Sequence, residues 1–506
     1  MTTVWITGDQ LCEWNSALAT RGDARSTTVV LMIESLERAR LLPYHKRKLV
    51  LIYAAMREFA ARLRESGWTV DYLAERESFE SALAEHVAGW KPERVVAMHQ
   101  SEYGATERLA AMTAAHGLEL EVTGHTNFVS SAAEFDELWR GKSRLTMEIF
   151  YRAMRRKTGL LLDEAEPAGG QWNYDARNRK PPRADMLVPP EPALPERAGV
   201  REAIALVERH FPGNPGVVGS FDIPVTRADA LAWFEHFVEY RLAAFGPYED
   251  AMLSTEAVLY HSRISAPLNV GLVHPLELCE RVEAAYRAGG VPLASAEGFI
   301  RQIIGWREFV WQTYWRFMPE YRSRNALDAR LPLPALFSTG ETDMACVRTV
   351  LGRVRSLGWA HHIERLMILG NFMLLAGVDP AAANDWFWYS FVDGYEWVMA
   401  PNVIGMTLHA DGGIVGTKPY AASAAYINKM SDYCRGCRYD RTASTGKDAC
   451  PFTTLYWDFL SRHEARFAAN PRMSLVLAQL RRKPRAERDA IRKRAAEVLE
   501  ALSAPR

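Results

Sequence analysis

Cysteine is scarce in this chain: only six of its 506 residues are cysteines, at positions 12, 279, 346, 434, 437 and 450. Six thiols over this length are far too few for the dense disulfide framework of small secreted domains. Net charge is absent as well, because 61 basic residues balance 61 acidic ones. A neutral chain has no global attraction for DNA or for an anionic membrane, so any nucleic-acid surface must be a local patch.

Long apolar runs are also missing. No stretch approaches the roughly 18 to 20 apolar residues of a membrane helix. The first residues, MTTVWITGDQL, lack the basic and apolar segments of a signal peptide. We therefore expect no membrane partner and a cytoplasmic location. What the chain does have is a 48% share of hydrophobic residues, enough at this length for several domains with large cores.

The first third of the chain alternates short apolar stretches with amphipathic helical patterns. Strands are predicted at residues 4–7, 29–34, 69–74, 94–99 and 118–123, and helices at 43–66, 79–90 and 102–116. This alternation is typical of a doubly wound α/β domain with a parallel sheet, whose ligands bind beyond the carboxyl ends of the strands. Asp9, Gln10 and Glu34 lie at two of those ends.

The middle of the chain changes character. Residues 162–220 are rich in proline, glycine and charge, and are predicted to be a long interdomain linker. From Arg227 to about Ala469 the patterns are almost all helical, and a charged helix is predicted at 481–502. We therefore divide the chain into 1–135 (α/β), 136–224 (interdomain helix and linker), 225–470 (helical) and 471–506 (charged helical tail).

Four cysteines in the second half have the spacing of metal ligands. Cys434 and Cys437 form a C-x-x-C pair, and twelve residues separate Cys437 from Cys450, which proline follows. Two thiolates one turn apart and a third after a loop can hold one metal centre, with Cys346 as the candidate fourth ligand. Spacing alone is equally compatible with structural zinc and with an iron–sulfur cluster. Free buried thiols are the plainest alternative.

Five blocks around these cysteines resemble the bacterial iron–sulfur photolyases and cryptochromes, the prokaryotic (6-4) photolyase branch. The blocks are FGPYEDAM (245–252), YHSRISAPLNVGL (260–272), FIRQIIGWREF (299–309), GWAHHIERLMILGNF (358–372) and DWFWYSFVDGYEWVM (385–399). The resemblance covers essentially the whole chain. It implies photolyase/cryptochrome architecture: an α/β antenna-binding domain, a long linker, and an all-α domain that binds FAD and a [4Fe-4S] cluster on Cys346, Cys434, Cys437 and Cys450.

The resemblance also implies residues for the cofactors. The loop from His261 to Ser265 offers hydroxyl and backbone N–H groups that suit a pyrophosphate. The implied FAD contacts are Tyr248, His261, Ser262, Arg263, Ile264, Ser265, Gln302, Arg307, Arg365 and Asp393. The implied antenna is 6,7-dimethyl-8-ribityllumazine, on Asp9, Gln10 and Glu34. Taken singly, each FAD contact is as well explained by a helix cap or a surface charge.

The run from Gly358 to Arg365 resembles the GW-x-HH-x-x-R segment of (6-4) photolyases, whose second histidine faces the lesion. The resemblance therefore gives His362 the catalytic role of proton donor or hydrogen-bond partner, which a histidine pKa near working pH suits. Eukaryotic enzymes carry another histidine four residues on, where this chain has Leu366. Met399 stands about where the enzymes that repair cyclobutane dimers meet flavin N5 with asparagine. Packed core histidines are the alternative reading.

Electron transfer and DNA contact are assigned in the same way. Trp386 matches the position nearest the flavin, and Phe387 beside it cannot be oxidised as tyrosine can. A lesion must be flipped out of the duplex and received by apolar and aromatic side chains. The resemblance places Met406, Lys418, Tyr420 and Tyr426 at the lesion or the DNA. Lys429 and the basic linker residues Arg177, Arg179, Lys180 and Arg183 are candidate phosphate contacts.

The predicted function is light-driven repair of DNA carrying a pyrimidine photoproduct, by a monomeric (6-4) photolyase in which excited FADH⁻ gives an electron to the flipped lesion. The cluster is expected to brace the helical domain. One alternative is a cryptochrome-type blue-light sensor without repair. Another is a primase-like iron–sulfur module that binds nucleic acid, and a third is a zinc-stabilised helical protein without flavin.

Overall fold

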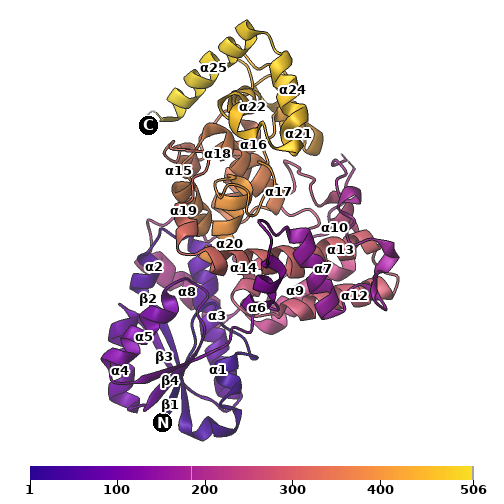
Figure 1. Cartoon of the computed structure of the whole chain (residues 1–506). Coiled ribbons are helices and arrows are strands. Elements are labelled where there is room, and N and C mark those ends of the chain that lie inside the picture. Colours follow the sequence, from indigo (N-terminus) through magenta and orange to yellow (C-terminus); the bar gives the residue numbers. More distant parts are fainter. Residues whose placement is uncertain (184, 504–506) are drawn as a thin grey trace.

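The structure is a computed structural model that describes residues 1–183 and 185–503. Five parallel strands near the N-terminus form one sheet in the order β3-β2-β1-β4-β5 (Figure 1). The strands are β1 (Thr2–Trp5), β2 (Thr28–Ser35), β3 (Thr69–Arg76), β4 (Arg94–Met98) and β5 (Glu119–Thr123). The predicted strands and the doubly wound parallel sheet are therefore confirmed, with shifts of a few residues at the ends.

Both faces of this sheet are buried, as the near-continuous apolar strands require. Successive side chains in β1 point to opposite faces: Val4 joins the main core of the molecule, and Trp5 joins a smaller second core. The helices α4 (Phe79–Trp90) and α5 (Ala105–Ala115) cover the second core. The long helix α3 (Lys46–Glu65) covers the main-core face of the sheet. The residues that pack on α3 therefore connect the sheet to the rest of the protein.

The proline-rich segment at 162–220 is more ordered than a free linker. It contains the helix α8 (Ala198–His210), which packs along α3 with Ala203, Leu206 and Val207 buried. These apolar residues recur at helical spacing, but the flanking prolines hide the pattern in the sequence. The predicted tail helix likewise begins earlier and is split into α24 (Ser474–Arg482) and α25 (Arg485–Ser503), which Pro484 separates.

The second half of the chain is helical (Figure 1). Its principal helices are α9 (Arg227–Tyr240), α10 (Leu242–Tyr248), α11 (Ser265–Asn269), α12 (Pro275–Arg287), α13 (Leu293–Ile300), α14 (Glu308–Phe317), α16 (Ala345–Leu357), α17 (His362–Glu364), α18 (Asn371–Ala376), α19 (Pro380–Ser390), α20 (Glu396–Ala400), α21 (Ala424–Met430) and α22 (Pro451–Arg462). Three π-helical segments continue them: η4 (Arg301–Arg307), η6 (Arg365–Gly370) and η7 (Pro401–Thr407). No helix among the described residues is long and apolar enough to cross a membrane.

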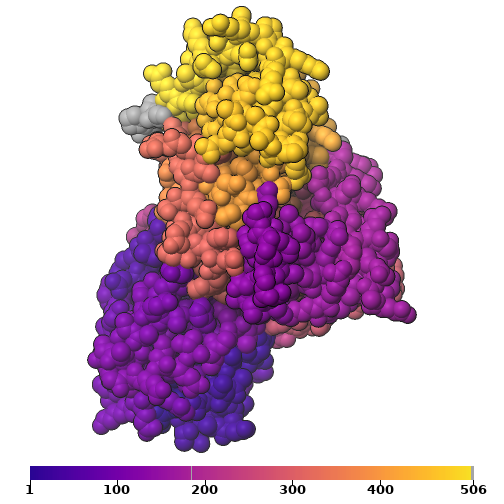
Figure 2. Space-filling model, in the orientation of Figure 1, coloured from indigo at the N-terminus to yellow at the C-terminus, as the bar shows by residue number. Residues whose placement is uncertain are grey.

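The two halves meet at the N-terminal end of α3. In Figure 2 the N-terminal lobe, coloured indigo and purple, sits directly against the helical body. The fully buried ammonium group of Lys48 donates to the carbonyl oxygens of Trp388, at 3.0 Å, and of Gly394. The backbone N–H of His45 donates to the carbonyl oxygen of Tyr389 at 2.8 Å. The sheet domain is thus fixed to the end of α19 and to the loop that follows it.

Candidate active site and metal-binding site

Four cysteines from separate segments line one small cavity. Cys346 lies in the first turn of α16, Cys450 immediately precedes α22, and the C-x-x-C pair lies in and after the turn η8 (Tyr433–Gly436). All six cysteines of the chain are free thiols, and Cys12 and Cys279 lie outside this cavity. The structure therefore brings together the four predicted metal ligands, Cys346, Cys434, Cys437 and Cys450.

Four thiols around one cavity are the donor set of a structural zinc site or of an iron–sulfur cluster. Burial and the neighbouring thiols raise the pKa of Cys346, and burial raises that of Cys450 to about 11. A positive metal centre is what turns such thiols into thiolates, so the four cysteines fit a metal-binding site.

A second cluster of polar groups lies where the histidine-containing blocks meet. The rings of His261 and His361 stack with centroids 4.6 Å apart, and the ring of His362 lies edge-on to His261 at 5.5 Å. Nε2 of His261 and both ring nitrogens of His361 are buried without a hydrogen-bond partner. Burial without partners costs roughly 1–3 kcal/mol per group unless a bound molecule satisfies it. This cluster therefore fits the polar part of a cofactor such as FAD.

The pair of Arg365 and Asp393 borders this cluster. The guanidinium of Arg365 donates two hydrogen bonds to the Asp393 carboxylate, at 2.9 and 3.1 Å, and Ser265 Oγ donates a third at 2.6 Å. Burial alone would raise the pKa of Asp393, but Arg365 and Ser265 outweigh burial and lower it. The carboxylate is therefore charged and fixed in direction. Three of the predicted FAD contacts thus lie in one hydrogen-bonded group.

His362 is the half-exposed member of the histidine cluster, with 45% of its side chain accessible. Its Nε2 atom lies 3.4 Å from the carboxylate of Asp250. Burial would lower the pKa of His362, but the Asp250 hydrogen bond and the nearby Glu249 charge outweigh burial and raise it. The predicted catalytic histidine therefore holds a proton more readily than a free histidine does, next to the buried rings of His261 and His361.

The residues predicted to contact the lesion or the DNA have several neighbours in common. Asp250 and Arg179 both act on the pKa of Tyr420 and of Tyr426, which burial raises in each case. A Cβ atom on Gly416 would lie 3.6 Å from the Tyr420 ring and 3.7 Å from the backbone of Met406. The pKa of Lys418 is lowered by burial and by the nearby charges of Arg472 and Arg179. Arg179, in the linker, thus shares a charged neighbourhood with the segment before the C-x-x-C pair.

Other predicted FAD residues have different neighbours. Arg307 donates to the carbonyl oxygen of Asn127 at 2.9 Å and stacks on the Phe128 ring. Both partners belong to the segment that follows the last strand of the sheet. Arg263 forms ion pairs with Glu191, at 2.5 Å, and Asp222, at 3.0 Å, in the linker. Ser262 and Ile264 are joined by a local hydrogen bond, and Tyr248 lies with its ring centroid 5.9 Å from that of Tyr260. Gln302 binds Glu249 at 2.8 Å.

The predicted antenna residues fall into two groups. Gln10 is buried, and its Nε2 atom donates to the carbonyl oxygen of His99 at 2.9 Å, while its Oε1 atom has no partner. Asp9 accepts a hydrogen bond from Thr7 at 2.8 Å. Glu34 is fully buried and saturated, because it accepts from Arg57, Tyr72 and the backbone of Glu75. Arg57 and Tyr72 in turn line an open cleft of about 540 Å³ on the sheet domain.

Trp386 is surrounded by phenylalanine rings. Its indole N–H donates to the carbonyl oxygen of Phe337 at 3.1 Å, and the ring centroids of Phe387, Phe337 and Phe391 lie at 5.0, 5.1 and 5.8 Å. The guanidinium of Arg365 lies 4.1 Å from the centroid of Phe391. Phe391 therefore separates Trp386 from the pair of Arg365 and Asp393.

Sequence reasoning missed several groups that define the site. Asp250 and Glu249 belong to the FGPYEDAM block, where two adjacent acids after Tyr248 were an available signal. Lys48 had no signal, because one lysine near the start of a long helix is ordinarily a surface residue. The sequence could not show that the ring nitrogens of His361 are buried without hydrogen-bond partners, because this depends on the fold that stacks His261 against that ring.

Known proteins share both sequence and fold with this chain. The family model described as deoxyribodipyrimidine photo-lyase-related protein matches residues 4–223. A (6-4) photolyase of Agrobacterium fabrum is 41% identical over 504 residues, which is 99% of both chains. The crystal structure of a bacterial class III photolyase from Agrobacterium tumefaciens has a TM-score of 0.61 at 15% identity, covering 92% of this chain and 97% of that one.

A cryptochrome of Synechocystis sp. PCC6803 has the same fold, with a TM-score of 0.56 at 12% identity, covering 85% of this chain and 88% of its own. The two structural matches show the photolyase/cryptochrome fold, and the full-length match at 41% identity shows the branch. The chain therefore belongs to the photolyase/cryptochrome family, in the branch of the bacterial (6-4) photolyases.

Proposed function

We propose that this protein is a light-driven DNA-repair flavoprotein that reverses (6-4) photoproducts. The observation that carries the proposal is the position of His362, which is half exposed, is paired with Asp250, and lies against His261 and His361, whose rings have buried nitrogens without hydrogen-bond partners. Full-length identity of 41% to a (6-4) photolyase supports it. FAD, held by His261, His361, Ser265, Arg365 and Asp393, would supply the photochemical electron.

The residues of this chain have separate tasks in the proposal. Tyr420, Tyr426 and Met406 receive the flipped base, and Lys418 and Arg179 supply positive charge for the backbone phosphates. His362 holds a proton in reach of the lesion, because the Asp250 and Glu249 carboxylates favour its charged form. The protein acts as a monomer.

The remaining cofactors are also proposals. An iron–sulfur cluster on Cys346, Cys434, Cys437 and Cys450 would tie α16 to the segment before α22 and so brace the helical body. The lumazine antenna would contact Asp9 and Gln10, where the unpartnered Gln10 oxygen offers an acceptor. The saturated Glu34 would have to exchange one of its present partners to join them.

Repair of defined DNA tests the function. The purified protein is incubated with an oligonucleotide that carries one (6-4) photoproduct, in blue light and in darkness, and restored thymines are measured by chromatography. We expect repair in light only, and loss of at least about 100-fold in rate for His362→Ala, the usual scale for removal of a general acid, with unchanged flavin absorbance. A wild-type protein with bound flavin and no repair in light would contradict the proposal and favour the sensor.

A further inference from the structure

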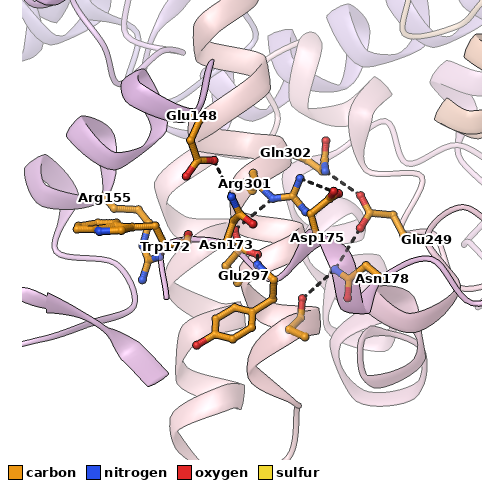
Figure 3. A network of polar contacts seen from close by, with 12 residues as sticks. Glu148, Arg155, Trp172, Asn173, Asp175, Asn178, Glu249, Glu297, Arg301 and Gln302 are labelled. Atoms are coloured by element: carbon orange, nitrogen blue, oxygen red, sulfur yellow. Dashed lines mark hydrogen bonds and ion pairs between the residues drawn. The ribbon is translucent and has the colours of Figure 1, made fainter. Parts of the chain in front are cut away.

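A buried carboxyl group lies behind the proposed lesion site. Glu249 directly follows α10 and is 5% exposed. Its Oε1 atom accepts a hydrogen bond of 2.8 Å from the side-chain amide of Gln302 in η4. Figure 3 shows the two side chains pointing toward each other, Glu249 from the residue after α10 and Gln302 from η4. Gln302 is partly buried, whereas Glu249 is buried.

This contact fixes the direction of the Gln302 amide. A charged carboxylate can only accept hydrogen bonds, so the NH₂ end of Gln302 must face Glu249. The carbonyl oxygen Oε1 then faces the other way, as Figure 3 shows. Without Glu249, the amide could turn by half a rotation and present its NH₂ end instead.

Glu249 is itself held in place. Its Oε2 atom accepts from the amide of Asn178 at 3.4 Å, and the same amide donates to the carbonyl oxygen of Ala294 at 3.1 Å. Gly298 leaves room for this contact, because a Cβ atom there would lie 2.7 Å from the Asn178 amide nitrogen and 3.3 Å from Glu249 Oε2. The linker and α13 therefore lock the carboxyl group that orients Gln302.

Glu249 and Asp250 are neighbours in the chain with parallel tasks. Asp250 lies 3.4 Å from Nε2 of His362, and the Glu249 charge also favours the protonated form of His362. Two adjacent residues thus contact two site residues: Asp250 contacts His362, and Glu249 contacts Gln302. His362 and Gln302 lie in two different helices, each of which includes a π-helical segment. The sequence assigned Gln302 to the flavin, but this contact gives it a second task.

We propose that Glu249 is a positioning residue that holds the Gln302 carbonyl oxygen toward the substrate, so that the protein selects a pyrimidine lesion presenting a hydrogen-bond donor. The inference rests on the proposed function and names the chemistry of recognition at that site. Gln302 is the group that touches the substrate, and Glu249 acts through it.

The charge of Glu249 makes the selection depend on pH. Burial raises the pKa of Glu249 to about 7. The groups that face it are Arg301 and His362, which favour its charged form, and Asp250 and Asp175, which oppose it. When the carboxyl is protonated, it can donate as well as accept, and the amide direction is no longer fixed. Preference for lesion DNA is therefore expected to be greater at pH 8 than at pH 6.

Dark binding measurements test the inference. Fluorescence anisotropy gives Kd for a duplex with one (6-4) photoproduct and for the same undamaged duplex, using the flavin-loaded protein at pH 6 and pH 8. Glu249→Gln keeps the size of the side chain and removes the fixed acceptor. We expect this variant to lower the preference for lesion DNA over undamaged DNA about tenfold at pH 8, the scale of one hydrogen bond. We also expect it to remove the part of the pH dependence that comes from Glu249, leaving the part that comes from His362.

The double variant Glu249→Gln/Gln302→Glu provides a rescue. Residue 302 would then be a carboxylate, an acceptor in every orientation, and the amide introduced at position 249 would donate to it. We expect the affinity ratio to recover to within about threefold of wild type. The matched control is Glu283→Gln in α12, a partly buried acid that accepts from the backbone of Leu161 away from the site. It should leave the affinity ratio unchanged.

The outcomes separate the two proposals. If the wild type shows no preference for lesion DNA, the proposed function fails. If the wild type shows the preference and Glu249→Gln retains it in full, or if the double variant is no better than Glu249→Gln, the positioning role fails. Flavin absorbance and the melting temperature of each variant report folding. The wild type alone gives a further test. If its preference for lesion DNA over undamaged DNA does not fall from pH 8 to pH 6, the inference is overturned.

Discussion

At the scale of single residues, the buried acids of this protein differ in charge because their hydrogen-bond donors differ. Asp393 receives three hydrogen bonds from Arg365 and Ser265, and its pKa is lowered despite burial. Glu364 accepts from Arg353 and Tyr433 through one oxygen, while its second oxygen is buried without a partner. Burial therefore wins at Glu364 and raises its pKa to about 7. The charge and hydrogen bonds of Arg365 and Ser265 outweigh burial at Asp393, whereas those of Arg353 and Tyr433 do not outweigh burial at Glu364.

Glu364 should make stability depend on pH. Because its folded pKa of about 7 lies above the ordinary 4.5, its stabilising contribution is complete below the unfolded pKa and is lost as pH rises through 7. The Glu364→Gln variant stays neutral throughout. We expect the difference in unfolding free energy, wild type minus variant, to fall by about 3 kcal/mol between pH 4.5 and pH 8. Urea unfolding at several pH values measures it, and a flat difference would refute the assignment.

The cysteines allow a matched comparison of equal substitutions. Cys346→Ser removes one proposed ligand from the cavity, whereas Cys279→Ser changes a thiol in α12 that is also buried but lies outside the cavity. We expect Cys346→Ser to lose most of its iron and to fold in poor yield, and Cys279→Ser to keep its iron. Iron analysis of the two purified proteins decides the point. Equal iron content in both would remove Cys346 from the proposed ligand set.

At the scale of elements, the π-helical segments mark the proposed site. Gln302 and Arg307 lie in η4, Arg365 begins η6, and Met406 lies in η7. Wider turns of this kind are rare and are often found at functional sites. The extra residue in each turn changes which side chains face inward. Spacing rules for an α-helix therefore cannot tell from the sequence that Gln302 and Arg307 have separate partners.

The surroundings of Trp386 in α19 lead to a prediction on electron transfer. Its ring neighbours Phe387, Phe337 and Phe391 cannot be oxidised as tyrosine or tryptophan can. Phe387→Tyr places an oxidisable ring about 5 Å away. We expect photoreduction of the bound flavin, followed by absorbance with a reductant present, to become several-fold faster. The control is the same change in a Trp386→Phe background, where the gain should vanish; a gain that persists would exclude Trp386 from the route.

The sequence predicts best those features whose signal lies within a short stretch of the chain. The strands of the sheet and the C-x-x-C pair were predictable, because short apolar runs and fixed cysteine spacings report local geometry. Cys346 was a candidate ligand from the sequence alone, but its assignment to a cluster and the role of His362 came from the family resemblance, since their partners are distant in the chain. The support from Glu249 and Asp250 required the fold itself, which brings the residues after α10 against η4 and α17.

At the scale of the whole molecule, one buried cation joins the two halves. Burial lowers the pKa of Lys48 well below its ordinary value, and the ammonium lies against the rings of Tyr44, at 4.4 Å, and Tyr395, at 5.2 Å. Its carbonyl acceptors are at Trp388, near the end of α19, and at Gly394, which directly follows Asp393. Displacing the sheet domain would strip these carbonyls of their donor, so the two halves should unfold together.

Lys48→Met tests this coupling. The substitution keeps an apolar stem and removes the donor, leaving two buried carbonyl groups unsatisfied. We expect a loss of about 2–4 kcal/mol in the free energy of unfolding and a thermal transition that separates into two steps. Lys46→Met is the control, because Lys46 pairs with the half-exposed Glu208 and such a pair contributes about 1 kcal/mol or less. Equal effects of the two substitutions would contradict the role of Lys48.

The fixed attachment of α3 to the helical body has an optical consequence. In the proposed assignment, one chromophore rests on the sheet domain near Gln10, and the flavin rests beside Asp393, which directly precedes the Lys48 acceptor Gly394. Transfer of excitation energy depends steeply on the separation and mutual angle of the two transition dipoles. A rigid junction gives every molecule the same separation and angle. The emission of the antenna should therefore decay with a single lifetime in the loaded protein, and with a spread of lifetimes once Lys48 is replaced.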